Sequence, residues 1–235
     1  MTARLLLIRH GESTANVAAA AAEADGAEAI AVEARDADVP LSALGERQAA
    51  TLGQALRDHA VSAADSFSSP YLRAVQTARA AGVERPALRL DERLRDRELG
   101  VIDALTALGV ERRLPLEAER RRWLGKFYYR PPGGESWADV ALRVRSFLRD
   151  LPAGDGTAVI FTHDAVVSVF LFVLLGMTED ELSEFLRTRP VTNASVTVLA
   201  RGADGWRVDA FADDTHLAEV GVPATEHQGN ARADA

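Results

Sequence analysis

The chain of 235 residues contains no cysteine, a single lysine (Lys126) and only five histidines. The absence of cysteine excludes disulfide bonds, iron–sulfur ligation and thiol catalysis, and five histidines leave little material for a histidine-rich metal site. The 35 acidic and 27 basic side chains give a net charge of −8, which argues against a basic nucleic-acid-binding surface. The arginine- and alanine-rich composition is typical of a GC-rich bacterial genome.

The sequence also has no long hydrophobic run. Its most apolar segment, residues 165–177, is shorter than the ~20 residues that a membrane span requires. The first hydrophobic run, Leu5–Ile8, is too short for the core of a signal peptide and leads at once to Arg9 and His10. We therefore expect a cytosolic protein that does not associate with membranes.

Short apolar runs with strand character alternate with helical patterns along the chain. The predicted strands are residues 5–8, 66–68, 88–90, 157–161, 195–199 and 206–211, the last two forming a hairpin. This alternation predicts an α/β fold, a three-layer α/β/α sandwich around a mostly parallel, mixed sheet. No Pro- or Ser-rich linker divides the chain, so we predict one domain over residues 1–222 and a polar, disordered tail over 223–235.

Two helix starts carry specific signals. Ser69 and Pro70 predict a helix that has serine as its N-cap and proline in its first turn. Ser136-x-x-Asp139 predicts a capping box, followed by an apolar stripe of Trp137, Val140, Ala141, Val144 and Phe147. Residues 116–129 have helical character but many arginines, so we expect them to be exposed or lid-like. We interpret residues 127–136, aromatic and then Gly-rich, as a lid wall that selects the substrate.

Two of the histidines follow buried strands. Leu5–Ile8 leads into Arg9 and His10, and residues 157–161 lead into Thr162 and His163, each directly before a helix start. Strand ends and helix N-termini in α/β sheets bind anions, because free backbone N–H groups and the helix dipole point there. Arg9 supplies a two-pronged donor suited to phosphate, and His10 is a candidate nucleophile or base. Either histidine alone is as easily structural, but the pair indicates a site.

Arg73 lies in the first turn of the helix predicted after Ser69, although an arginine there is usually just exposed. The chain thus carries, in order, Arg9-His10-Gly11-Glu12, Pro40-Leu41-Ser42-x-x-Gly45, Ser69-Pro70-x-x-Arg73 and Thr162-His163. This combination resembles the histidine phosphatase superfamily, the phosphoglycerate-mutase-like proteins, over about residues 4–217.

The resemblance implies a phosphoglycerate-mutase-like fold and a mechanism. His10 attacks the phosphorus atom in line, and water then hydrolyses the phosphohistidine. Arg9, Arg73 and His163 surround the phosphate oxygens and offset their charge. Asn16 matches the position that hydrogen-bonds the same phosphate. The resemblance implies neither a metal ion nor another cofactor, because cationic side chains take the role of Mg²⁺.

The proton donor is where the sequence departs from the family pattern. Members usually carry Glu in a Leu-Arg-Glu-x-x-x-Gly segment, and this chain has Asp96 at that position. Aspartate is one methylene shorter, which displaces the carboxyl group by about an ångström. Glu98 is the second candidate, and Asp164, directly after the second histidine, is the third. Glu98 and Asp164 are also candidate substrate-binding residues. For all three carboxylates the alternative is a structural role, either balancing nearby arginines or capping a helix.

We favour hydrolysis of a small phosphomonoester, such as a sugar phosphate, or of a phosphopeptide. A cofactor-dependent phosphoglycerate mutase is the first alternative, but mutases of the family have a Gly- and Trp-rich loop after the asparagine. Residues 16–40 of this chain are Ala- and Glu-rich and lack tryptophan. A non-catalytic phospho-ligand-binding module is the second alternative, and Asp96 in place of glutamate is its best support. The sequence does not identify the substrate or the oligomeric state, with a homodimer kept as an option.

Overall fold

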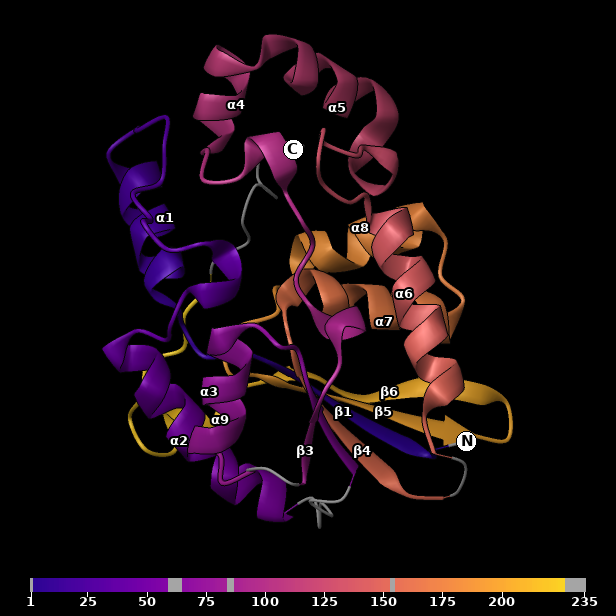
Figure 1. The fold of residues 1–235 in the computed structure, drawn as a ribbon. Coiled ribbons are helices and arrows are strands. Elements are labelled where there is room, and N and C mark those ends of the chain that lie inside the picture. Colours follow the sequence, from indigo (N-terminus) through magenta and orange to yellow (C-terminus); the bar gives the residue numbers. More distant parts are fainter. Residues whose placement is uncertain (1, 59–64, 84–86, 153–154, 227–235) are drawn as a thin grey trace.

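The computed structural model describes residues 2–58, 65–83, 87–152 and 155–226. At its centre lies a six-stranded sheet with the strand order β3-β2-β4-β1-β5-β6 (Figure 1). The strands are β1 (Arg4–Arg9), β2 (Ser66–Ser68), β3 (Leu88–Leu90), β4 (Thr157–Thr162), β5 (Val196–Gly202) and β6 (Gly205–Asp213). β1, β2, β3 and β4 are mutually parallel, whereas β5 runs antiparallel to β1 and β6. The sheet is mixed and mostly parallel, as the sequence predicts.

Helices cover both faces of this sheet. They are α2 (Ala43–Asp58), α3 (Leu72–Ala80), α6 (Trp137–Asp150), α7 (Asp164–Leu175), α8 (Glu179–Thr188) and α9 (Thr215–Ala218). Because side chains alternate along a strand, Leu5 and Leu7 of β1 pack into one core with α6, α7 and α8. Leu6 and Ile8 point to the opposite face and pack with α2 and α3. The predicted three-layer sandwich is confirmed.

Helix α6 forms as its sequence pattern predicts. The Ser136 hydroxyl accepts a hydrogen bond from the Asp139 backbone N–H (3.1 Å), and the Asp139 carboxylate accepts one from the Ser136 N–H (2.8 Å). All five residues of the predicted apolar stripe are buried. Capping and 3.6-residue periodicity thus agree with the tertiary packing here.

Helix α3 begins later than predicted. Its first residue is Leu72 and its N-cap is Tyr71, so the expectation that Ser69 caps the helix with Pro70 in its first turn is wrong. The Ser69 N–H donates to the carbonyl of Phe161 (2.9 Å), which continues the pairing of β2 with β4 by one residue. This extended backbone at Ser69 postpones the helix.

Three further helices form a cap away from the sheet: α1 (Thr14–Ala24), α4 (Ala107–Arg113) and α5 (Pro115–Tyr128). Figure 1 shows α4 and α5 at the top of the view and α1 beside them. The cap has a small core of its own, made by Ile102, Val110, Ala118 and Tyr129. Trp123 on α5 is 83% exposed, which agrees with the expected exposed helix.

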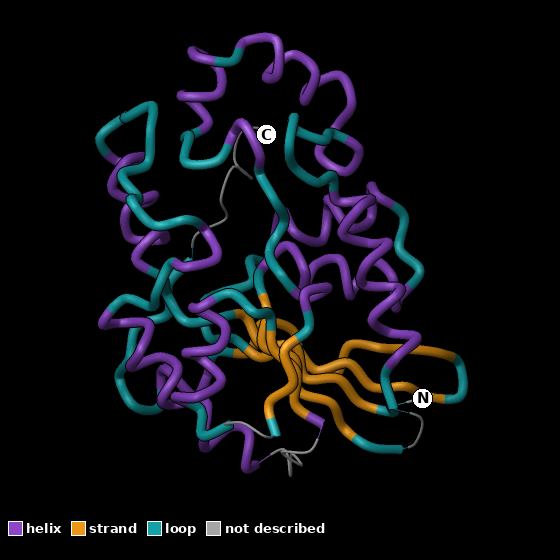
Figure 2. The backbone as a smooth tube through the Cα atoms, viewed as in Figure 1, coloured by secondary structure: helices purple, strands orange, loops and turns teal. Residues whose placement is uncertain are grey.

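Residues 25–42 connect α1 to α2. They begin with the long loop at the upper left of Figure 2. We call residues 25–39 the insertion. It contains one short 3₁₀ helix, η1 (Asp36–Asp38). Ala29 forms an isolated β-bridge with Leu105, so the insertion is attached to the cap.

The structure describes the chain to residue 226, beyond the predicted domain boundary at residue 222. The carbonyl of Pro223 accepts a hydrogen bond from Gln48 (3.0 Å), and that of Thr225 accepts one from the Asn193 N–H (2.9 Å). The rest of the predicted tail, residues 227–235, lies outside the described residues. Within the ranges that the structure describes, no helix combines the length and the apolar character needed to cross a membrane.

Candidate active site

The register of the sheet brings the two motif histidines together. Arg9 at the end of β1 pairs with Thr162 at the end of β4, so His10 and His163 follow at the same edge of the sheet. The His10 N–H donates to the Thr162 carbonyl (3.0 Å). The two imidazole rings meet edge to face with centroids 5.1 Å apart, and both side chains are buried. Two segments about 150 residues apart in sequence therefore contribute to one site.

The contacts of His10 define its tautomer. Nδ1 lies 2.7 Å from the carbonyl oxygen of Gly11, which can only accept, so Nδ1 carries the proton. Nε2 then has a free lone pair, and it accepts a hydrogen bond from Nε of Arg73 (3.2 Å). Burial, followed by the charges of Arg73, His163 and Arg9, lowers the pKa of His10 well below its ordinary value. His10 is a neutral imidazole whose lone pair faces a guanidinium.

Two buried arginines flank this imidazole. Arg9 and Arg73 are 3% and 4% exposed. The guanidinium of Arg9 is fixed by a hydrogen bond that Nη1 donates to the carbonyl of Val191, in the segment before β5. Arg73 reaches the site from the first turn of α3. Rigid, desolvated guanidiniums are strong ligands for a phosphoryl group.

Asp96 reaches the same site in spite of its short side chain. Its Oδ2 atom lies 3.1 Å from Nη2 of Arg73 and 3.3 Å from Nδ1 of His163. Its Oδ1 atom accepts a hydrogen bond from the Arg97 backbone N–H (2.8 Å). We call residues 94–100 the acid segment. Its main chain places the Asp96 carboxylate where Arg73 and His163, two of the expected phosphate ligands, can contact it.

The other two candidate acids differ in position. Asp164, the first residue of α7, lines the cavity, and burial raises the pKa of its carboxyl group although Arg9 opposes this effect. Glu98 is exposed and accepts a hydrogen bond from the Tyr71 hydroxyl (2.8 Å). Its neighbours Arg97 and Leu99 line the cavity, whereas Glu98 between them does not.

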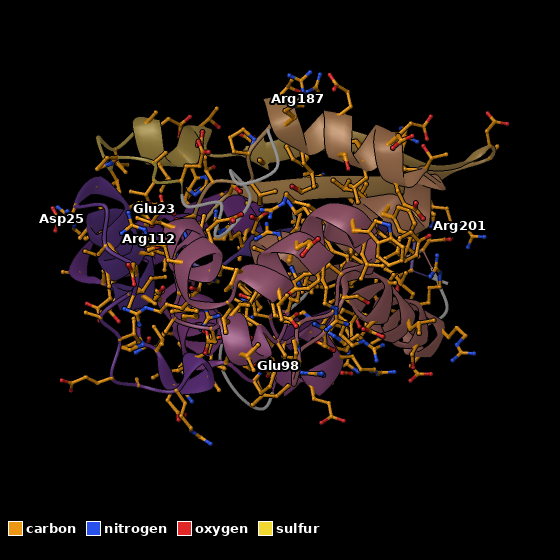
Figure 3. All side chains as sticks on the ribbon, turned by 90° about the horizontal axis from the view of Figure 1, so that it is seen from above. Glu23, Asp25, Glu98, Arg112, Arg187 and Arg201 are labelled. Carbon is orange, nitrogen blue, oxygen red and sulfur yellow. The ribbon has the colours of Figure 1, made fainter. Side chains whose placement is uncertain are left out.

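Figure 3 shows Glu98 well apart from Glu23, a side chain of α1 that lines the cavity. The cavity lining therefore does not support Glu98 as a proton donor or substrate-binding residue, and that expectation stays a prediction. The Glu98 side chain is exposed and is held by the Tyr71 hydroxyl.

Asn16 lies in the cavity lining, and its amide is partly engaged by the protein. Its Oδ1 atom accepts from the Ser13 N–H (3.0 Å) in a capping box at the start of α1. Asn193 donates to the carbonyl of His10 (3.1 Å) and lies 3.4 Å from the same Oδ1 atom. The amide nitrogen of Asn16 is the donor left for a phosphate oxygen.

Three residues of the site were missed or misread from the sequence. Asn193 has no motif around it, and Asp36 lies in the Ala- and Glu-rich insertion, so neither gave a local signal. Ser69, expected to cap a helix, places its hydroxyl 2.9 Å from Nε2 of His163. Burial, then the charges of Arg73, Arg143 and Arg9, lower the pKa of His163 well below its ordinary value, so His163 is also neutral.

The site opens into a cavity of about 360 Å³. Its lining includes Arg9, His10, Arg73, Asp96 and Asp164, and we call this part the phosphate-binding end after the role that the sequence predicts for it. The insertion supplies an apolar wall to the cavity, made by Ile30, Val32, Ala34 and Val39. Three cationic side chains also line the cavity: Arg97 from the acid segment, and Arg121 and Lys126 from α5. We call this outer part of the cavity the leaving-group end.

The expected aromatic lid wall is not where the sequence suggested. Phe127 packs against Phe172 (ring centroids 4.8 Å apart), Tyr128 hydrogen-bonds to Glu179, and Tyr129 is buried in the core of the cap. These three side chains are outside the cavity lining. The positive φ of Gly125 (71°) interrupts α5, and after it Phe127 and Tyr128 face α7 and α8 rather than the site.

Comparison with known proteins gives a consistent picture. The chain is 30% identical to the phosphoglycerate mutase-like protein AT74H of Arabidopsis thaliana, over 86% of this chain and 75% of that protein. It is 29% identical to the probable phosphoglycerate mutase GpmB of Yersinia enterocolitica, over 91% and 94% of the two chains.

A solved structure of a mycobacterial glucosyl-3-phosphoglycerate phosphatase in complex with VO3 superposes with a TM-score of 0.70 and 27% identity, covering 90% of this chain and 99% of that one. Both the predicted fold and the predicted kind of enzyme, a histidine phosphatase, are thereby confirmed. The model of the histidine phosphatase superfamily (branch 1) matches residues 5–214, and the chain belongs to this family.

Proposed function

We propose that the protein hydrolyses a small phosphomonoester through a phosphohistidine on His10, without a metal ion. Nε2 of His10 forms a bond to phosphorus as the bond from phosphorus to the ester oxygen breaks. Asp96 gives its proton to that oxygen, and the alcohol leaves. Asp96 then takes a proton from a water molecule, whose oxygen attacks phosphorus, releases His10 and yields inorganic phosphate.

Four side chains offset the charge of the transferring group in this mechanism. Arg9, Arg73 and His163 surround the equatorial oxygens, and Asn16 donates to one of them. The positions of these groups around His10 support the assignment. Asp164 takes the role of a substrate-binding residue at the start of α7, where it also balances the charge of Arg9.

The observation that carries the proposal is the state of His10. An in-line nucleophile needs an unprotonated nitrogen directed at the phosphate site. The contact of Nδ1 with the Gly11 carbonyl, together with burial, leaves Nε2 as this nitrogen beside Arg73.

The test is hydrolysis of p-nitrophenyl phosphate in the presence of EDTA. We expect turnover by the unmodified protein, and a loss of at least about 10⁴-fold in His10→Ala because the covalent route is closed. His216→Gln is the matched control, since His216 lies on α9 and outside the cavity lining. Rapid-quench labelling should give an acid-labile, alkali-stable adduct on His10. Tight vanadate binding without turnover would instead indicate a binding module.

A phosphoglycerate mutase is the second candidate, and the names of the two relatives favour it. A mutase must protect its phosphohistidine from water and rebind the intermediate. The apolar insertion without tryptophan argues for hydrolysis instead. Exchange between 3- and 2-phosphoglycerate in the presence of the bisphosphate, faster than phosphate release, would decide for the mutase.

We also propose the setting in which this reaction occurs. The partner is a small phosphomonoester rather than a nucleic acid or a membrane, and the compartment is the cytosol of a bacterium. A homodimer stays a prediction, which light scattering of the purified protein tests.

A further inference from the structure

A carboxylate from the insertion contacts the phosphate-binding arginine. Asp36, in the 3₁₀ turn η1, places Oδ1 2.8 Å from Nη1 of Arg73. Its backbone carbonyl accepts a second hydrogen bond from the same nitrogen (2.6 Å). Asp36 belongs to none of the motifs that identify the family, and the proposed mechanism does not use it.

These contacts decide which side of the guanidinium is available. Arginine has five N–H donors in a plane, and a phosphate is held best by two parallel donors on one edge. Asp36 contacts Nη1 through its carboxylate and its carbonyl, so the edge between Nη1 and Nη2 is engaged by the insertion. The edge formed by Nε and Nη2 has no contact with Asp36.

The remaining edge is the one that faces the reaction. Nε donates to Nε2 of His10 (3.2 Å), and Nη2 lies 3.1 Å from Oδ2 of Asp96. A phosphate on this edge is next to both the nucleophile and the proposed proton donor. A phosphate on the opposite edge would be held away from His10.

The insertion is fixed on both sides of Asp36. On one side, the Ile30 N–H donates to the carbonyl of Ala104 (2.8 Å). On the other side, Val39 is buried and the Leu41 N–H donates to the side chain of Gln76 on α3 (2.8 Å). Asp36 therefore contacts Arg73 from a segment that is attached on both sides and that also forms the apolar wall of the leaving-group end.

We propose that Asp36 is a positioning residue for the phosphoryl-transfer site: it occupies one side of Arg73 so that only the edge facing His10 binds phosphate. The inference rests on the proposed function. It predicts that geometry and charge at Asp36 have separable effects. The carboxylate lies next to the bound anion, so it weakens phosphate binding while it directs that binding to the productive edge. Burial raises the pKa of Asp36, and the charge of Arg73 opposes this effect.

The experiment compares Asp36→Ala and Asp36→Asn with Asp38→Ala. Asp38 belongs to the same turn but is paired with Arg35, and both side chains are well exposed. Asparagine retains an oxygen that accepts from Nη1 and lacks the charge, whereas alanine loses both. We measure kcat with p-nitrophenyl phosphate and the Kd of inorganic phosphate by calorimetry, after checking that each variant has the Tm of the unmodified protein.

We expect Asp36→Ala to lower kcat on the order of 10-fold, because only the backbone carbonyl of residue 36 then holds Nη1 and phosphate also binds at the other edge. Asp36→Asn should restore kcat to within about threefold. Both variants should bind inorganic phosphate about 3- to 10-fold more tightly, since a negative charge has been removed. Asp38→Ala should change neither value.

Equal kcat and equal phosphate affinity in all three variants would overturn the proposal, and so would an equal loss of kcat in both Asp36 variants with unchanged affinity. If the unmodified protein shows no turnover, the proposed function fails. The phosphate affinities alone then decide on Asp36, tighter binding in both Asp36 variants supporting it and unchanged binding overturning it.

Discussion

The two ends of the cavity are built in different ways. At the phosphate-binding end, Arg9, His10, Arg73 and His163 are at most 4% exposed and are fixed by strand ends and short hydrogen bonds. At the leaving-group end, Glu28 of the insertion is held to α4 by Arg112 and Arg113, whose side chains are 62% and 52% exposed. Exposed ion pairs contribute little to stability, typically about 0–1 kcal/mol. The phosphate-binding end is therefore fixed by buried contacts, whereas the side-chain contacts between Glu28 and α4 are exposed and contribute little.

This difference explains how one family can accommodate several substrates. Removing a buried arginine at the phosphate-binding end leaves buried partners without a counter-charge, which is strongly destabilising. A change at an exposed position of the insertion or of α5 leaves these buried contacts in place. The leaving-group end can therefore vary while the phosphate-binding end is preserved.

The largest expected effect tests the phosphate-binding end. Arg73→Lys retains the positive charge but loses the two-pronged donor. We expect kcat to fall by about 10²- to 10³-fold, and equally for every phosphomonoester, because the lost contact is to the phosphoryl group itself. Steady-state kinetics with alkyl and aryl phosphates measure this.

Arg121→Lys is the matched variant at the leaving-group end. Its effect should stay below about tenfold and should depend on the substrate, because Arg121 lines the outer part of the cavity. A uniform loss as large as that of Arg73→Lys would abolish the distinction between the two ends.

The next largest effect tests the proton donor. Asp96→Asn should lower the rate on alkyl phosphates by about 10²-fold or more. The loss on p-nitrophenyl phosphate should be below about tenfold, since its leaving group scarcely needs a proton. Glu98→Gln, outside the cavity, should leave both rates near those of the unmodified protein. Equal losses on both substrates in Asp96→Asn would rule out Asp96 as the general acid.

A smaller effect tests the attachment of the insertion. A Cβ atom on Gly109 of α4 would lie 1.8 Å from the carbonyl oxygen of Glu28, so Gly109→Ala must push the insertion away. We expect a loss of about 1–3 kcal/mol in the free energy of unfolding and a several-fold higher KM for substrates with large leaving groups. The KM for phosphate esters with small leaving groups should hardly change.

Gly26→Ala is the control for this variant, because no atom lies within 4 Å of the added Cβ and only its positive φ (+62°) is strained. Denaturant unfolding and KM values with two substrate sizes report both effects. Similar results for the two alanine variants would show that the close contact at Gly109 has no special role.

The smallest expected change is the titration of the site histidines. Burial lowers the pKa of His10 and of His163 well below the ordinary value of about 6.5. Their imidazole NMR signals should therefore stay in the neutral form as the pH falls from 7 to 6. A midpoint near 6.5 for His10 would contradict the buried, neutral nucleophile.

The same lowered pKa values fix the sign of a stability effect. In the unfolded chain these histidines bind protons below about pH 6.5, whereas in the folded chain they stay neutral. The unfolded state then binds more protons, so the Tm should fall as the pH drops through 6.5. This effect should be weaker in His10→Ala, which removes one of the two groups.

The sequence predicted best what depends on local periodicity and on strand ends. β1, β4 and the buried stripe of α6 follow from runs of apolar residues, and the two strand ends brought His10 and His163 to one edge. The start of α3 failed, because pairing between strands at Ser69 outweighs the preference of Ser-Pro for a helix start.

The rest depends on contacts between distant segments. Asp36 meets Arg73 through a loop with no regular pattern, and Asn193 reaches the His10 carbonyl from the residues before β5. The acid segment contains two candidate carboxylates, Asp96 and Glu98, and the sequence does not show that only Asp96 lines the cavity. No pattern in composition or spacing encodes these directions.

The cavity lining has one further practical consequence. Lys126 is the one lysine of the chain, and it lies at the leaving-group end with its ammonium 4.7 Å from the ring centre of Trp137. Amine-directed reagents therefore have a single side-chain target, located in the lining of the cavity. An environment-sensitive dye coupled there would report the arrival of each candidate ester directly, without the need to follow its breakdown.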